Sequence, residues 1–327
     1  MMAQVKQHES LTDRLPAVRG SLVPNADLSN MIWFRTGGPA EVLFKPADLD
    51  DLQQFLKNLP ADIPVFMVGV GSNLLVRDGG VDGVVIKLGK PFAHINIDGC
   101  KVTAGAGAID ITVAHKSAEA GIGGLEFLRG IPGTIGGAIK MNAGAYGREV
   151  ADALTQVTII TRQGEVKTLS HNDCDFRYRK SAIGDDMIVV EATFEGTKED
   201  SHVVIERMEA INKAREESQP LRTKTGGSTF KNIVGNDDGE KAPISAWQLV
   251  DQAGCRGLSV GDAQVSEKHC NFLINHGGAS AHDLETLGEL VREKVLDKTG
   301  HQLHWEIKRV GKFVNGREVE VKVGIKS

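Results

Sequence analysis

The chain has 327 residues, of which 41% are hydrophobic and 25% charged, as in soluble globular proteins of about two domains. Lys and Arg number 38 against 43 Asp and Glu, giving a net charge of −5, and only 5% of residues are aromatic; this argues against a dedicated nucleic-acid-binding protein. No apolar run approaches the ~18 residues of a membrane helix, and the first residues lack a signal-peptide core. Four scattered cysteines without a C-x-x-C pair suit a reducing cytosol. We therefore predict a cytoplasmic protein without nucleic-acid or membrane partners.

Strands and helices alternate in the first part of the chain. Its first 18 residues are polar and unpatterned, which is typical of a loose extension. Asp48 can cap one helix, Gly121 can end another, and Asp98-Gly99 is typical of a hairpin turn. The pattern predicts strands at 41–44, 65–70, 81–88, 94–97 and 101–104, and helices at 49–56 and 109–120.

The second part of the chain carries equally clear end signals. Ser280-Ala-His-Asp283 is a capping box that opens a helix ended by Gly300. Asn315-Gly316, between two runs with strand character, is a strong hairpin signal. We predict strands at 154–161, 187–194, 271–275, 302–313 and 317–323, and helices at 203–217, 247–253 and 281–299.

Glycine is enriched, at 38 residues, and gathers in two loops. Gly69-Val-Gly-Ser-Asn-Leu-Leu75 follows a predicted strand, where backbone N–H groups can converge on a phosphate; the alternative is a plain turn. Leu74 stands where the Rossmann fingerprint needs its third glycine, and no P-loop motif occurs. The stretches 128–137 and 141–147 are so rich in small residues that we favour a site for a flat ligand over a tightly packed turn.

Three further segments are ambiguous on composition alone. Residues 173–181 combine Tyr178 with several cations, and a solvated basic loop is the simpler interpretation. The glycines at 226 and 227 leave the hydroxyl of Ser228 sterically uncovered; the alternative is that Ser228 caps a helix. Glu306 sits in a strand-like run, where an exposed carboxylate is the alternative. The histidines near the C-terminus are isolated and no H-E-x-x-H occurs, so we predict no metal site.

Eight segments together resemble the UDP-N-acetylenolpyruvoylglucosamine reductase family. They occur in the family's order and include Gly227-Ser-Thr-Phe-Lys-Asn232 and Leu303-His-Trp-Glu306. A chance match of all eight in order is very improbable. The matching segments are 35–40, 69–75, 130–137, 141–147, 178–181, 227–232, 265–269 and 303–306.

The resemblance implies an α+β fold with a two-lobed FAD-binding region of the vanillyl-alcohol-oxidase type and a separate α/β substrate domain. It also implies a reaction in which NADPH reduces FAD and the flavin reduces the enolpyruvyl ether of a UDP-sugar to UDP-N-acetylmuramate, a peptidoglycan precursor. The expected divisions are an extension at 1–18, FAD lobes at 19–88 and 89–218, a substrate domain at 219–302, and a segment at 303–327 that carries Glu306 and packs on the first lobe.

The resemblance also assigns roles to residues. Arg179 would stabilise negative charge on the substrate's carboxylate side, Glu306 would donate a hydrogen bond there, and Ser228 would donate the proton. The substrate ligands would be Tyr178, Arg179, Lys231 and Asn232. The FAD contacts would be Gly69, Gly71, Ser72, Asn73, Leu74, Ile131, Pro132, Gly133, Thr134, Gly136, Gly137, Asn142, Ala143 and Gly144.

Two departures from the family pattern stand out. Ile233 replaces a common proline, where we expect only a local change of turn. Residues 182–227 contain no tyrosine, so the chain resembles the branch that lacks a tyrosine-bearing lid, and we expect a monomer with an open site. The rival hypotheses are another FAD oxidoreductase of the vanillyl-alcohol-oxidase type and a non-catalytic nucleotide-sugar-binding protein.

Overall fold

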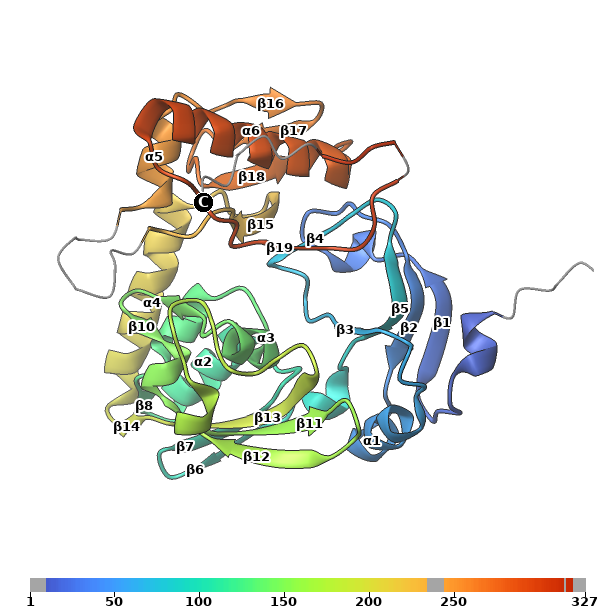
Figure 1. Cartoon of the computed structure of the whole chain (residues 1–327). Helices are drawn as coiled ribbons and strands as arrows, with labels where there is room; N and C mark the ends of the chain where they lie inside the picture. Colours follow the sequence, from blue (N-terminus) through green and yellow to red (C-terminus); the bar gives the residue numbers. More distant parts are fainter. Residues whose placement is uncertain (1–9, 234–243, 315, 320–327) are drawn as a thin grey trace, which may run out of the picture.

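A computed structural model of the chain describes residues 10–233, 244–314 and 316–319. Figure 1 shows three units in chain order: a first lobe in blue, a second in green, and a third in orange to red. Each unit combines a sheet with at least one helix, so the α+β prediction is correct.

The first lobe is a four-stranded sheet with one helix packed on it. Asp48 caps this helix by accepting a hydrogen bond from the Asp51 N–H, as predicted, and Phe55 packs against Phe44. Residues 11–18, expected as an extension, pack against the same core. In sheet order the elements are β1 (Ser21–Ala26), β2 (Ala40–Lys45), β5 (Val81–Ile86) and β3 (Val65–Met67), with helix α1 (Leu49–Asn58).

The second lobe is a five-stranded antiparallel sheet with three helices on one face (Figure 1). The predicted hairpin turns at Asp98-Gly99, where Gly99 takes a positive φ of 58°. The strands in sheet order are β12 (Val166–Ser170), β11 (Leu154–Thr161), β13 (Met187–Glu195), β7 (Lys101–Gly105) and β6 (Ile95–Asp98). The helices are α2 (Asp110–Glu119), α3 (Ile135–Lys140) and α4 (Ser201–Ser218), and two short pairs join β8 (Ile122–Gly123) to β14 (Thr197–Lys198) and β9 (Gly144–Ala145) to β10 (Arg148–Glu149).

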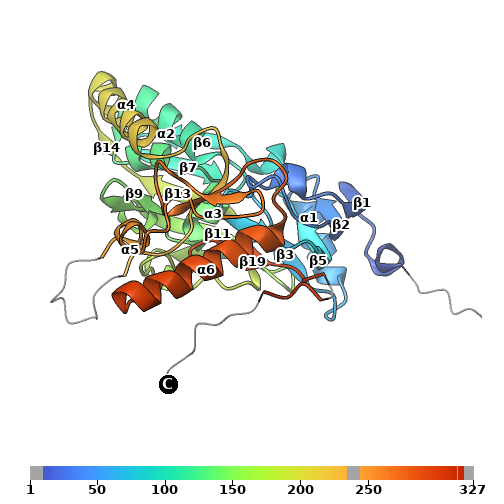
Figure 2. The same ribbon diagram turned by 90° about the horizontal axis from the view of Figure 1, so that it is seen from above.

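The third unit is a four-stranded antiparallel sheet covered by a long helix, which Figure 2 shows lying across the molecule. Ser280 and Asp283 form the predicted capping box, and Gly300 ends the helix in the left-handed conformation. The strands in sheet order are β15 (Lys224–Ser228), β18 (Phe272–Asn275), β17 (Ala263–Val265) and β16 (Ser259–Val260), with helices α5 (Ala246–Gln252) and α6 (Ala281–Thr299).

The C-terminal segment returns to the first lobe. Strand β19 (Lys308–Val310) pairs in parallel with β4 (Leu74–Val76), directly after the first glycine loop. The predicted hairpin is wrong: only three residues of 302–313 form a strand, they pair with β4, and residues 317–319 are not in a strand. Residues 315 and 320–323 lie outside the described ranges. One apolar core joins the first lobe to the third unit through Leu303 and Ile307.

Candidate active site

A cleft of about 1060 Å³ lies where the three units meet. Its walls come from both glycine loops, the segment 219–231 and the segment 305–308. Most sites for a single small molecule have volumes of ~300–1,000 Å³. The cleft therefore has room for a large cofactor together with part of a second ligand.

The first glycine loop is held tightly at the cleft wall. Gly71 has a positive φ of 66°, and a Cβ there would lie 2.5 Å from the Met31 carbonyl oxygen, so only glycine fits. Asn73 donates its side-chain amide to the Glu306 carbonyl oxygen at 3.2 Å, and its own carbonyl accepts the Lys308 N–H at 3.1 Å. The first loop is thereby joined to the segment that carries Glu306.

The second glycine loop meets the first across the cleft. A Cβ on Gly69 would lie 2.7 Å from Thr134 Oγ1, and a Cβ on Gly133 would lie 2.6 Å from Asp110 Oδ2. A side chain at Gly69 would force the two loops apart, and one at Gly133 would force the second loop away from helix α2. A Cβ on Gly137, in contrast, would meet nothing closer than 3.8 Å, so this position offers bare backbone to the cleft.

Twelve of the fourteen residues expected to contact FAD line this cleft, and two do not. Gly136 packs on Ala106, which a Cβ would approach to 3.1 Å. Asn142 is fully buried, donates to the Arg177 carbonyl oxygen at 3.2 Å and accepts the Ala151 N–H at 3.0 Å. Both residues shape the loop from behind, and the small residues in front leave the backbone exposed as a flat dinucleotide cofactor requires.

Arg179 and Glu306 form an ion pair at the cleft wall, with Arg179 Nε 3.0 Å from Glu306 Oε1. Their side chains are 20% and 15% exposed, so the interpretation of Glu306 as an exposed strand carboxylate is wrong. Burial raises the pKa of Glu306, and the charges of Arg179 and Lys231 oppose that rise in part. Arg179 also donates to the Gly144 carbonyl oxygen at 3.0 Å, which ties the pair to the second loop.

Ser228 lies in the same cleft, at the end of β15. A register shift between Thr225 and Ser228 marks a bulge, which re-aims side chains at such positions. Gly227 has a positive φ of 78°, and a Cβ there would meet only the Ser72 carbonyl oxygen, at 3.8 Å. The Glu306 N–H donates to the carbonyl oxygen of the residue after Ser228 at 2.8 Å, so the serine and the carboxyl are on adjacent chain segments.

The four residues expected to bind substrate divide into two pairs. Arg179 and Lys231 line the cleft, whereas Tyr178 and Asn232 do not. The Tyr178 ring stacks 5.1 Å from the Arg179 guanidinium, and burial raises the pKa of its phenol. The Asn232 side-chain oxygen accepts the Ala246 N–H at 3.0 Å, at the start of α5. Tyr178 therefore packs against Arg179 outside the cleft lining, and Asn232 holds the start of α5.

Arg215 and Trp305 also line the cleft, although neither was among the predicted site residues. Arg215 lies in the last turn of the charged helix α4, yet it is only 6% exposed. It donates weakly to the Arg129 carbonyl oxygen at 3.4 Å and forms no ion pair within the described part of the chain. Burial lowers its pKa. A buried guanidinium without a carboxylate partner is suited to an anionic ligand.

Neither a metal centre nor a membrane-spanning helix is present in the described residues. Among them no group of three or more His, Cys, Asp or Glu side chains is arranged to hold a metal ion. No helix in these ranges is long and apolar enough to cross a membrane.

Two protein-family models match the chain. The C-terminal domain of UDP-N-acetylenolpyruvoylglucosamine reductase matches residues 219–310, and an FAD-binding domain matches residues 40–170, which hold both glycine loops. The reductase of Parvibaculum lavamentivorans is 54% identical over 92% of this chain and 95% of its own length. The chain belongs to the UDP-N-acetylenolpyruvoylglucosamine reductase family.

Other members of the reductase family agree over the same span. The reductase of Gluconobacter oxydans is 52% identical over 92% of this chain and 96% of its own length. The crystal structure of the reductase from Thermus caldophilus superposes with a TM-score of 0.76 at 33% identity, covering 90% of this chain and 99% of that one. The match therefore includes all three units and the cleft between them.

Proposed function

We propose that the cleft reduces enolpyruvyl UDP-N-acetylglucosamine to UDP-N-acetylmuramate, with FAD bound in it and NADPH as the source of hydride. Membership of the reductase family supports the reaction. The observation that carries the residue roles is the convergence of Arg179, Glu306 and Ser228 on one cleft that both glycine loops also line.

The two glycine loops are the FAD site in this proposal. Backbone N–H groups of 71–73 would face the pyrophosphate, and the small residues of 131–134, with Gly137, Ala143 and Gly144, would accommodate the ring system. When bound, FAD supplies the hydride that NADPH has given it. Since Asn73 bonds to the main chain at Glu306, the cofactor loop and the catalytic segment share one support.

Arg179 and Glu306 stabilise charge on the substrate. Addition of hydride to the methylene carbon of the enolpyruvyl group builds negative charge on the neighbouring carbon, and this charge spreads into the carboxylate. A guanidinium beside that carboxylate stabilises it, and does so more strongly where water is excluded. Burial raises the pKa of Glu306, and the charge of Arg179 opposes that rise; when Glu306 is protonated, its carboxyl can donate a hydrogen bond to the same group.

Ser228 completes the reduction by donating a proton to the carbon that carries the charge. A hydroxyl is a weak acid, but it is sufficient toward so basic a carbon when it is held in place. The bulge before Ser228 and the hydrogen bond from Glu306 to the next residue hold it there. Positioned proton transfer typically contributes ~10²–10⁴-fold to rate.

Two further cations of the cleft are suited to the diphosphate of the UDP-sugar. Lys231 and Arg215 both line the wall, and Arg215 lacks a carboxylate partner in the described ranges. The protein is proposed to act as a monomer, and its four free cysteines support a cytoplasmic location. The two rival functions lack such support, because neither an oxidase of small alcohols nor a binding protein requires a buried Arg–Glu pair beside a presented serine.

The test is NADPH consumption by the purified protein with and without the enolpyruvyl UDP-sugar, after its visible spectrum has been recorded. We expect a yellow protein whose NADPH oxidation depends on that substrate. A yellow protein that ignores the substrate would favour the rival oxidoreductase. A colourless protein that cannot be loaded with FAD would favour the binding protein.

A further inference from the structure

Trp305 connects helix α6 to the catalytic segment. It directly precedes Glu306 and lines the cleft. Its indole Nε1–H donates to Glu289 Oε1 at 2.8 Å, and its ring lies 4.6 Å from the Arg309 guanidinium and 5.4 Å from the Phe230 ring. The indole is thus fixed on three sides by named contacts.

Gly288 lies against the fourth side of the indole. Glu289, Arg309, Phe230 and Gly288 together form the seat of Trp305. It lies in the interior of α6, where glycine is unfavourable compared with alanine. A Cβ there would lie 2.1 Å from Trp305 Cη2 and 2.3 Å from Cζ2. These distances are far too short for any side chain, so the indole packs directly on the helix backbone, and any larger residue at 288 would displace it.

Main-chain hydrogen bonds on either side of Trp305 set the register between the segment that carries Glu306 and the segment that begins at Ser228. The Lys231 N–H donates to the His304 carbonyl oxygen, and the Glu306 N–H donates to the Thr229 carbonyl oxygen, both at 2.8 Å. Phe230 and Trp305 form the bridge pair between these bonds. A displacement of the indole would therefore change the position of Glu306 relative to the segment that begins at Ser228.

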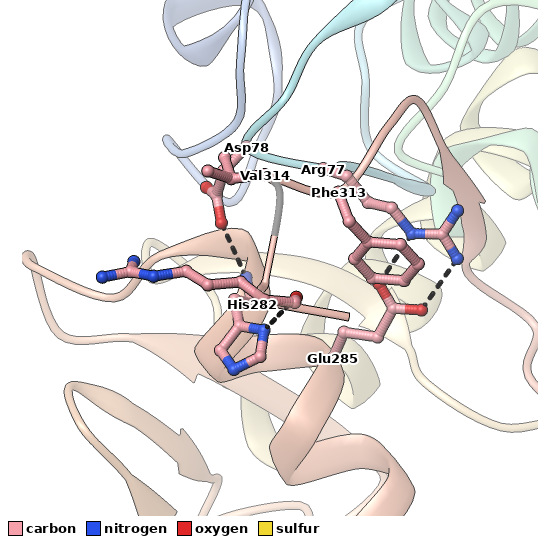
Figure 3. A pocket seen from close by; sticks show the side chains of 7 residues that line it. Arg77, Asp78, His282, Glu285, Phe313 and Val314 are labelled. Carbon is pink, nitrogen blue, oxygen red and sulfur yellow. Dashed lines mark hydrogen bonds and ion pairs between the residues drawn. The ribbon is translucent and has the colours of Figure 1, made fainter. Parts of the chain in front are cut away.

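Glu289 is itself held by a buried charge network. Glu289 and Glu285 are 6% and 2% exposed. Arg309 bonds to both carboxylates, at 2.9 and 3.1 Å, Arg77 bonds to Glu285 at 2.9 Å, and Arg292 pairs with Glu289. Figure 3 shows Arg77 of the first lobe directed at Glu285 on α6. The seat of the indole is therefore anchored to the FAD-binding side of the molecule.

We infer that Gly288 and Glu289 are positioning residues for the reduction: they seat Trp305 and so hold Glu306 in register with the Ser228 segment. The inference rests on the proposed function. It differs from a purely stabilising role in one respect. A stabilising contact affects unfolding alone, whereas a positioning contact affects the step that uses Ser228 and Glu306 and spares the reduction of FAD by NADPH.

The test separates the two half-reactions in the FAD-loaded enzyme by stopped flow. The variants are Gly288→Ala, Glu289→Gln and Trp305→Phe, and the control is Val295→Ala, a fully buried position on the same helix. We expect reoxidation by the enolpyruvyl UDP-sugar to slow ~10- to 100-fold at saturating substrate. The substrate concentration for half-maximal rate and the rate of reduction by NADPH should change little. Val295→Ala should lower the melting temperature and leave both rates near wild type.

Two results would overturn the inference. Equal slowing of both half-reactions, or unchanged reoxidation in all three variants, would show that the seat is structural only. Should one variant fail to fold, the other two decide. A wild-type enzyme whose reduced flavin ignores the substrate would instead contradict the proposed function, and the positioning role with it. That failure is recognisable because it appears before any substitution is made.

Discussion

The C-terminal segment carries buried charge pairs on two sides, and they differ in how completely each carboxylate is paired. On the cleft side, Glu306 meets a single guanidinium, that of Arg179. On the side of α6, Glu285 accepts hydrogen bonds from both Arg77 and Arg309. Glu285 is therefore more fully paired than Glu306.

This difference distinguishes a structural charge from a functional one. A carboxylate has about four acceptor positions, and Glu285 uses three of them for hydrogen bonds from Arg77 and Arg309. Glu306 has hydrogen-bonding capacity left, and burial raises its pKa, so it remains suited to bonding with a ligand. The comparison therefore predicts that substitutions at the cleft-side pair will change the rate, whereas substitution of Glu285 will change the stability.

The largest effect is expected for Ser228→Ala on the cleft side. Loss of the proton donor should lower turnover by ~10²–10⁴-fold or more, while reduction of FAD by NADPH continues. Steady-state kinetics with the enolpyruvyl UDP-sugar measure this. Thr225→Val, which removes a hydroxyl from the same strand, is the matched control and should change turnover little. Normal turnover in Ser228→Ala would refute the assignment.

Glu285→Gln should destabilise the protein by disrupting the charge network on the α6 side. Removing one partner from a buried charge pair typically lowers the free energy of unfolding by ~3–5 kcal/mol, because the guanidiniums lose their counter-charge. Denaturant unfolding followed by circular dichroism measures it. Below the melting temperature the rate of reduction of FAD by NADPH should stay near wild type. A variant of normal stability would show that the network does not hold α6 to the first lobe.

Arg179→Met should lower kcat by ~10²–10³-fold, the usual effect of removing one group that stabilises developing charge. Stability should change less than in Glu285→Gln, since the pair lies at the cleft wall, where the Glu306 side chain is 15% exposed against 2% for Glu285. The control is Arg177→Met, two residues away, whose partner Asp175 is exposed. A large loss of stability with only a slight loss of turnover in Arg179→Met would contradict the proposed difference between the cleft-side pair and the Glu285 network.

The smallest effect extends the comparison to a carboxyl with no cationic partner. Asp110 is fully buried, both of its oxygens lack a hydrogen bond in the described structure, and burial raises its pKa well above the usual value. As pH rises above the unfolded pKa, the unfolded state loses this proton first, so wild-type stability falls. Asp110→Asn should match wild type near pH 4 and be ~1–3 kcal/mol more stable near pH 8. A difference that does not change with pH would contradict this.

Sequence signals that act locally predicted the structure well. The cap at Asp48, the capping box at Ser280 and the hairpin at Asp98-Gly99 all occur where expected. Each of these signals depends on residues that are close together in the sequence. The loop at 69–75 could be located for the same reason, because a glycine-rich turn after a strand is a local feature.

Features that depend on distant contacts could not be predicted. Strand β19 pairs with β4, which is over two hundred residues away, and no neighbouring turn signals a parallel pair of three residues. Arg215 is charged and lies in a charged helix, so only the fold shows that it is buried. The motif around Asn142 located the loop, but which of its side chains face the cleft depends on packing against 151 and 177.

The central claim is that reduced flavin in this cleft is reoxidised by the enolpyruvyl UDP-sugar, with the proton coming from Ser228. The most direct measurement is an anaerobic experiment in which NADPH first bleaches the flavin and the substrate is then added. The account predicts that the wild-type absorbance returns in a single turnover with one equivalent of UDP-N-acetylmuramate, and that Ser228→Ala stays bleached. A wild-type flavin that stays bleached until oxygen is admitted would contradict the account.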